Sequence, residues 1–353
     1  MSQASQRPRA VSILITFAAF VVVVAGLRAA EPIVVPFLLS IFLAIICAPP
    51  LFWLERRGLP KWLAMLAVIS AIVVVALGIT ALLGNSINDF SRDIPFYKTR
   101  LKEQFGGLVT WLSSHGVQVT REQVLSYVNP GKAIELVGEI FNGFGGVLAN
   151  AFLIFLTVVF ILFEAHSFPS KIRAAIDDPE KKLKRFEQFT DNLIRYLAIK
   201  TLSSLGTGVA IGVWLAIMGV QYPVLWGLLA FLLNYVPNIG SIIAAVPALL
   251  LTVVQLGPIS ALWTGLGYLV VNILVGSVIE PRFMGRGLGL STLVVFLSLV
   301  FWGWLLGPVG MLLSVPLTMT MKIALDSSEE TRWLAVMLGP ESSAQMERKK
   351  GRS

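Results

Sequence analysis

The sequence has very few of the residues on which metal sites and disulfide scaffolds depend. It contains one cysteine, Cys47, and two histidines, His115 and His166. A single cysteine excludes an intrachain disulfide, and two histidines are too few for most histidine-built metal sites. The motifs H-E-x-x-H, G-x-x-x-x-G-K-S/T and G-x-S-x-G are also absent from the sequence. Because these motifs mark metalloproteases, nucleotide-binding loops and esterases, we expect no enzyme activity, metal or cofactor.

Charged residues are scarce as well. They make up 14% of the chain, and the mean hydropathy is +0.79, whereas soluble domains carry roughly 25% charged residues. No charged residue occurs between Lys200 and Glu280. A bilayer core about 30 Å thick needs ~20 apolar residues per helical span, so this run could hold about three crossings. The composition therefore predicts an all-α polytopic membrane protein.

The net charge is +8, which could indicate a nucleic-acid partner. However, the basic residues never gather into a stripe with interleaved aromatic residues, so we expect no nucleic-acid binding. Basic residues beside membrane spans and an anionic inner leaflet explain the charge better.

The hydropathy pattern predicts about eight transmembrane helices at ~20 residues per span. It divides the chain into six segments: three spans at 1–88, an extracytoplasmic helical insert at 89–139, a fourth span at 140–166, a cytoplasmic amphipathic helix at 167–200, transport-core spans at 201–325 and a cytoplasmic tail at 326–353. Within the core we expect a crossing at residues 225–251. Residues 287–321 form either one long span or two half-spans.

The distribution of basic residues predicts the orientation. The N-terminus, the turn at residues 56–61, segment 167–200 and the C-terminus all fall on one side of the membrane and are all basic. Positive charge marks the cytoplasmic side, so both termini are expected there, in a bacterial inner membrane. The nearly neutral segment 89–139 then lies outside, and alternation of spans puts Glu280 at the outer interface.

An interruption at residues 234–240 divides the uncharged run and predicts a broken or re-entrant helix there. Non-helical backbone at membrane depth survives only where protein buries it or where it lines a cavity. Asn234 and Asn238 could instead cap two half-helices around Pro237, and both roles can hold in a discontinuous transport helix. Amide side chains both donate and accept hydrogen bonds, which suits a small polar, uncharged solute. The residues expected along its pathway are Asn234, Pro237, Asn238, Gly240, Ser241, Gln255 and Asn272.

Glu280, Pro281 and Arg282 end the uncharged run. Charged residues inside a membrane tend to be paired and functional, so these three residues are candidates for a gate or a coupling site, with Arg282 neutralising Glu280. The alternative is that Pro281 breaks a helix whose charged end meets the outer headgroups.

Three stretches resemble those of the autoinducer-2 exporter family of permease-like proteins. They are N-Y-V-P-N-I-G at residues 234–240, I-E-P-R-F-M-G at 279–285 with G-L-S at 289–291, and F-W-G-W-L-L-G-P-V-G-M-L-L-S-V-P-L at 301–317. The resemblance covers nearly the whole chain and implies export of the quorum-sensing signal autoinducer-2, with effects on biofilm behaviour. Some members are described as sodium or lithium/proton antiporters.

Three functions therefore stand as hypotheses. The first is export of a small polar signal by alternating access, the second is cation/proton antiport through Glu280, and the third is a non-transporting membrane scaffold. Small-residue steps at Gly208/Gly212 and Gly303/Gly307 favour close helix packing and a homo-oligomer.

Overall fold

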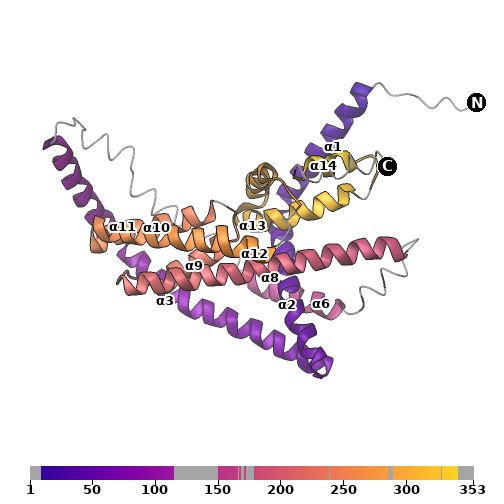
Figure 1. Cartoon of the computed structure of the whole chain (residues 1–353), viewed down its shortest axis with the longest axis horizontal. Helices are drawn as coiled ribbons and strands as arrows, with labels where there is room; N and C mark the ends of the chain where they lie inside the picture. The colour runs from indigo at the N-terminus through magenta and orange to yellow at the C-terminus, as the bar shows by residue number, and fades with distance from the viewer. Residues whose placement is uncertain are drawn as a thin grey trace, which may run out of the picture.

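The described part of this computed structural model comprises residues 9–114, 150–165, 167, 171, 179–237, 239–284, 289–326 and 328–340. His115, His166, Asn238, the second half of the predicted insert, the start of the fourth span and residues 341–353 lie outside it. Its helices are α1 (Arg9–Ala29), α2 (Glu31–Arg56), α3 (Lys61–Ser114), α6 (Ala151–Glu164), α8 (Pro179–Ile217), α9 (Pro223–Leu233), α10 (Gly240–Leu256), α11 (Pro258–Asn272), the π-helix η1 (Ile273–Ile279), α12 (Glu280–Met284), α13 (Thr292–Asp326) and α14 (Arg332–Met337). These residues form no strand, so the all-α prediction is confirmed (Figure 1).

Several helices have the length and composition of membrane spans. Five runs qualify by length and hydropathy: Glu31–Arg56, Lys61–Ala81, Thr190–Ile217, Pro258–Phe283 and Thr292–Asp326. Shorter apolar helices accompany them, among them Ala151–Glu164. Large apolar side chains such as Phe152 and Leu262 are about three-quarters exposed on the surface of the chain. Water would penalise such broad apolar surface, whereas hydrocarbon accepts it, so the chain is a multi-pass membrane protein.

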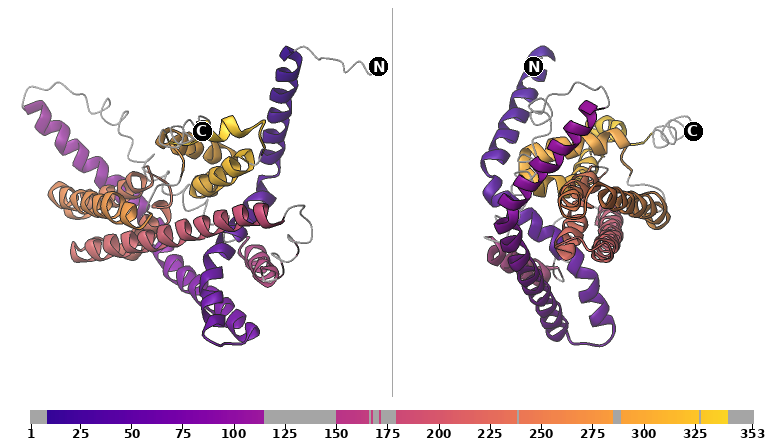
Figure 2. Two further views of the ribbon diagram at one scale, coloured as in Figure 1. Left: turned by 45° about the vertical axis from the view of Figure 1, so that its right-hand side comes forward. Right: turned by 90° about the vertical axis from the view of Figure 1, so that its left-hand side faces the viewer.

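Two long helices run through predicted segment boundaries. Helix α3 continues past residue 89 to Ser114, and in both views of Figure 2 its end projects beyond the helices around it. The first part of the predicted insert is therefore an extension of the third span. Helix α8 begins at Pro179, within the predicted amphipathic segment, and continues into the following span without a break.

The predicted broken or re-entrant helix near residue 234 is confirmed in its re-entrant form, because the chain turns back there. Helix α9 ends at Leu233 and α10 begins at Gly240. Before α9, the backbone N–H of Gln221 donates to Oε1 of Gln255, near the end of α10, at 3.0 Å. A Cβ added at Gly240 would overlap the carbonyl oxygen of Leu233, so only glycine closes this tip. Residues 223–256 are thus a re-entrant hairpin, here called the first hairpin.

This reversal changes where Glu280 lies. Asp93, in the extension of α3, accepts a hydrogen bond from Tyr222 at the base of the first hairpin. Glu280 instead contacts Lys200, in the N-terminal half of the span Thr190–Ile217. The prediction that Glu280 lies at the same membrane face as segment 89–139 is wrong, because it counted the first hairpin as a full crossing.

Helix α13 is a second hairpin. Leu306 and Gly307 leave the helical conformation, and Gly307 has φ 62° and ψ −151°, which favours glycine. The indole N–H of Trp302 donates to Oγ1 of Thr318 at 3.0 Å, so the two halves of α13 lie side by side. Residues 292–326 therefore form two half-spans instead of one long crossing, although the whole run is apolar enough for one.

The two hairpins start from opposite ends of the α8 span. The first begins at Gln221, just beyond the C-terminal end of α8. The second begins beside Leu290, which packs in a cluster with Leu193 and Leu197 from the N-terminal half of that span. Each hairpin thus enters the helical body from a different side.

The small-residue steps at Gly208/Gly212 and Gly303/Gly307 pack against other parts of the same chain. A Cβ on Gly227 of α9 would come within 2.7 Å of the carbonyl oxygen of Gly208, and Gly212 faces the same helix. Gly303 faces Met311 across the second hairpin. Both steps permit close packing, as predicted, but they are occupied by this chain's own helices and do not support a homo-oligomer.

Candidate functional site

One face of α8 carries polar residues through the apolar run. Lys200, Ser203, Ser204 and Thr207 are spaced three and four residues apart, so they line one side of the helix. All four are buried, with Lys200 only 6% exposed. Buried polar side chains require partners, and the partners of this helix face come largely from the first hairpin and from α12. We call Lys200, Thr201, Ser203, Ser204, Asn234, Tyr235 and Glu280 the tip cluster.

An ion pair forms one half of the tip cluster. The ammonium of Lys200 lies 2.7 Å from Oε1 of Glu280, and both side chains are largely buried, at 8% and 14% exposure. The hydroxyl of Ser203 donates to the same carboxylate oxygen at 2.8 Å. A buried ion is tolerated only with a counterion and hydrogen bonds, and this arrangement supplies both.

Hydrogen bonds from the first hairpin form the other half. The side-chain amide of Asn234 donates to Oγ of Ser204 at 3.0 Å. The hydroxyl of Tyr235 lies 2.8 Å from Oγ1 of Thr201. Thr201 donates its own hydroxyl to the carbonyl of Leu197, so it serves as the acceptor for Tyr235. The tip is therefore held on α8 by neutral hydrogen bonds that cost little to exchange for others.

A π-helix leads directly to Glu280. Residues 273–279 form η1 between α11 and α12. A π-helical turn adds a residue and rotates the faces that follow, and such turns occur frequently at functional sites. Here η1 precedes the residue whose carboxylate meets α8. The sequence offered no strong signal for it, because its residues are ordinary apolar ones.

The predicted pathway residues do not form one group. Asn234 and Gly240 lie at the tip, with Pro237 and Ser241 half-buried beside them. Gln255 lies at the opposite end of the first hairpin, bonded to Gln221.

The charged candidates are also separated, since Arg282 and Pro281 are exposed and the partner of Glu280 is Lys200. Asn272 is half-buried, directly before η1.

Sequence reasoning missed the α8 half of the cluster. From the sequence, no functional role is predicted for Lys200, Ser203 or Ser204. The signal was present, because polar residues at three- and four-residue steps in an uncharged run indicate a polar helix face. What the sequence lacked was the partner of that face, which lies far along the chain.

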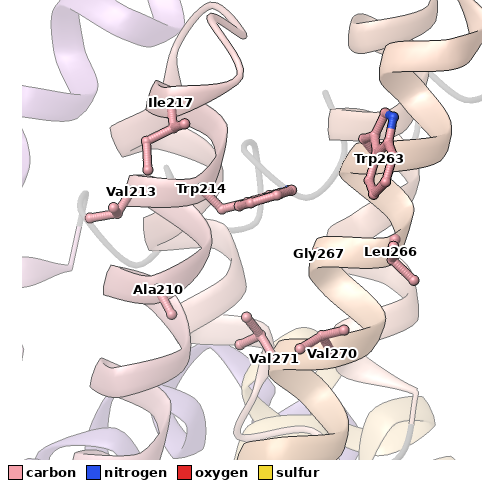
Figure 3. Close-up of a pocket in the computed structure, with 9 residues that line it drawn as sticks. All are labelled: Ala210, Val213, Trp214, Ile217, Trp263, Leu266, Gly267, Val270 and Val271. Atoms are coloured by element: carbon pink, nitrogen blue, oxygen red, sulfur yellow. The ribbon is translucent and has the colours of Figure 1, made fainter.

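A separate apolar hollow lies between α8 and α11. It has a volume of about 260 Å³, and Figure 3 shows the rings of Trp214 and Trp263 projecting into the gap. A Cβ on Gly267 would overlap the indole of Trp214, so the glycine makes room for that ring. The lining is almost wholly apolar, so it suits hydrocarbon and offers no route for a polar solute.

Comparison with known proteins identifies the family of this chain. Residues 14–330 match the family described as "AI-2E family transporter". A putative transport protein of Haemophilus influenzae is 42% identical over 332 residues, covering 92% of this chain and 95% of that protein. The AI-2 transport protein TqsA of Escherichia coli K12 is 40% identical over 326 residues, with 92% and 95% covered. The putative transport protein YhhT of the same strain is 39% identical over 328 residues, with 93% and 94% covered. This chain therefore belongs to the AI-2E transporter family.

Proposed function

We propose that the chain exports a small polar signal, autoinducer-2, across the bacterial inner membrane. The observation that carries the proposal is the docking of a re-entrant tip on a buried polar helix face with an ion pair. Polar groups at such depth are expensive and mark substrate or ion pathways. Discontinuous helices whose ends meet inside the membrane are the usual construction of transport sites. The choice of solute rests on similarity to the E. coli relative named for AI-2 transport.

Alternating access is the mechanism that fits two hairpins entering from opposite ends of the α8 span. If the first hairpin leaves the face of Ser204, the tip cluster opens toward one side. Movement of the second hairpin, against the same end of α8 as Leu290, would open it toward the other. Outward direction, cytoplasmic termini and an influence on quorum sensing and biofilm behaviour belong to the proposal. A homo-oligomer stays a prediction and needs a surface other than the glycine steps.

Cation/proton antiport is the second candidate, favoured by the buried carboxylate of Glu280. An antiporter needs a carboxylate that exchanges a proton for a cation inside the membrane. In this conformation the carboxylate of Glu280 is already paired with Lys200, with 2.7 Å between Nζ and Oε1. Antiport would therefore require the pair to separate in another state, which makes it the weaker reading of the geometry.

Sealed vesicles with labelled autoinducer-2, with and without an imposed proton gradient, test both functions. We expect Ser204→Ala, which removes the acceptor for Asn234, to slow signal efflux about fivefold, as expected for one lost neutral hydrogen bond. The matched control is Thr157→Ala, whose hydroxyl bonds only within α6 to Leu153. Normal efflux in Ser204→Ala and Glu280→Gln would refute the exporter proposal. Loss of salt-dependent proton exchange alone would favour antiport.

A further inference from the structure

A second polar hollow lies at the base of the first hairpin, at the opposite end from the tip cluster. It has a volume of about 530 Å³ and forms where the extension of α3 meets the loop before α9 and the end of α10. We call it the base pocket. Its lining consists of Asp93, Phe96, Tyr97, Arg100, Gly219, Gln221, Gln255 and Leu256. The volume lies within the range of about 300–1,000 Å³ typical of small-molecule sites.

The walls of the base pocket are fixed by hydrogen bonds between the three elements. The hydroxyl of Tyr222 donates to Oδ2 of Asp93 at 2.9 Å, and the hydroxyl of Tyr97 donates to Oε1 of Gln221 at 2.7 Å. The backbone N–H of Gln221 is held by Gln255. A lining set in place beforehand loses less conformational freedom when a solute binds.

Several polar groups of the lining remain available to a solute. Within the part of the chain that the structure describes, no hydrogen bond is made by Nε2 of Gln221, by Oδ1 of Asp93 or by the guanidinium of Arg100. The first and third are donors and the second is an acceptor. A hydroxyl group, which donates and accepts at once, can satisfy either kind.

The charge of the lining favours a neutral solute. The positive charge of Arg100 balances the negative charge of Asp93, and the other lining residues are uncharged. The ring of Phe96 is 56% exposed and Leu256 is 42% exposed, and the Arg100 guanidinium lies 5.5 Å from the Phe96 ring centroid. Phe96 and Leu256 therefore supply an apolar surface for the C–H groups of a ring or carbon chain.

We propose that the base pocket is a binding site for a small neutral polyhydroxylated solute, such as a five-carbon sugar or polyol. The amides, the carboxylate and the guanidinium hold its hydroxyl groups, and Phe96 packs against its carbon face. The site lies away from Ser204 and Glu280. It therefore does not depend on the export proposal, and binding can be measured without transport.

Equilibrium dialysis of the full-length protein in detergent micelles tests the site, with labelled ribose and ribitol as probes. Gluconate and glucosamine are anionic and cationic comparators of similar hydroxyl content. We expect saturable binding of ribose and ribitol at millimolar concentration, and weaker binding of both charged compounds. Arg100→Gln, which disturbs no hydrogen bond of the walls, weakens ribose binding about tenfold, as does loss of a charge-assisted hydrogen bond elsewhere. Asp93→Asn leaves the lining positive and shifts the preference toward gluconate.

The matched control is Thr99→Ala, on the same helix, whose hydroxyl bonds to the carbonyl of Pro95 and does not line the pocket. Phe96→Ala is the second test variant, since it removes the apolar surface without touching a hydrogen bond. Helical circular dichroism and gel filtration confirm that each variant is folded. No saturable ribose binding by the folded wild-type protein would overturn the proposal, and so would wild-type binding by both Arg100→Gln and Phe96→Ala.

Discussion

Replacing Glu280 by glutamine should destabilise the protein mainly through Lys200. At the observed separation of 2.7 Å, two unit charges attract by about 6 kcal/mol at an effective dielectric constant of about 20. Removing each ion from water costs several kcal/mol, so the intact pair contributes little net stability. Glu280→Gln leaves the ammonium buried without its counterion, and such a loss costs about 3–5 kcal/mol.

A double-mutant cycle measures this directly. The variants are Glu280→Gln, Lys200→Met and the two combined, with unfolding followed by tryptophan fluorescence in detergent micelles. Each single variant should lose about 3–5 kcal/mol, whereas the double variant should regain most of that loss because no unpaired charge remains. Asp326→Asn is the control, since its pair with Arg332 is 3.8 Å long and both side chains are 55% exposed. Exposed pairs contribute about 0–1 kcal/mol.

Additive losses would refute this reasoning. If the double variant lost the sum of the single losses to within about 0.5 kcal/mol, the two residues would not be coupled in the folded protein. The observed contact would then not represent the populated state in the membrane or micelle.

Two further predictions concern the first hairpin. Gly240→Ala places a methyl group against the carbonyl oxygen of Leu233 and should cost at least about 1–3 kcal/mol and abolish efflux, whereas Gly206→Ala, with open space around it, should be tolerated. Spectrophotometric titration of Tyr222 at alkaline pH tests the contacts at the base of the first hairpin. Burial, as the larger cause, and the hydrogen bond to Asp93 raise the pKa of Tyr222 above its usual value of about 10. Stability from this group is full below about pH 10 and falls as the pH rises further, because only the unfolded chain ionises readily there. Asp93→Asn should bring the titration to lower pH, and an unchanged curve would contradict the contact.

The interruption in the first hairpin could be predicted because its signal is local. Asn234, Pro237 and Gly240 stand close together in an otherwise apolar run, and each disfavours continuous helix. The sequence left open whether the helix is broken or re-entrant, since hydropathy scores the residues of a segment and carries no information on which side the segment leaves. Because the first hairpin was counted as a full crossing, Glu280 was predicted at the same membrane face as segment 89–139.

Only part of the tip cluster could be predicted from the sequence, for a similar reason. Asn234 and Glu280 were predicted as site residues, because polar groups in a membrane run attract notice. Their partners Ser204 and Lys200 were not, because each contact joins residues distant in the chain. In the same way Arg282 was the nearest opposite charge in sequence, yet its side chain is exposed and Lys200 takes its place.

The sequence by itself determined that this protein lies in a membrane, that it is helical and where its helices are interrupted. These properties follow from the transfer of individual side chains and backbone groups into hydrocarbon, which each short window of sequence already decides. Only the tertiary structure decided that residues 223–256 and 292–326 fold back as hairpins and that Lys200 neutralises Glu280. Such pairings depend on helix direction and on long-range packing, where many arrangements satisfy the same hydropathy but few bring a buried charge to its counterion.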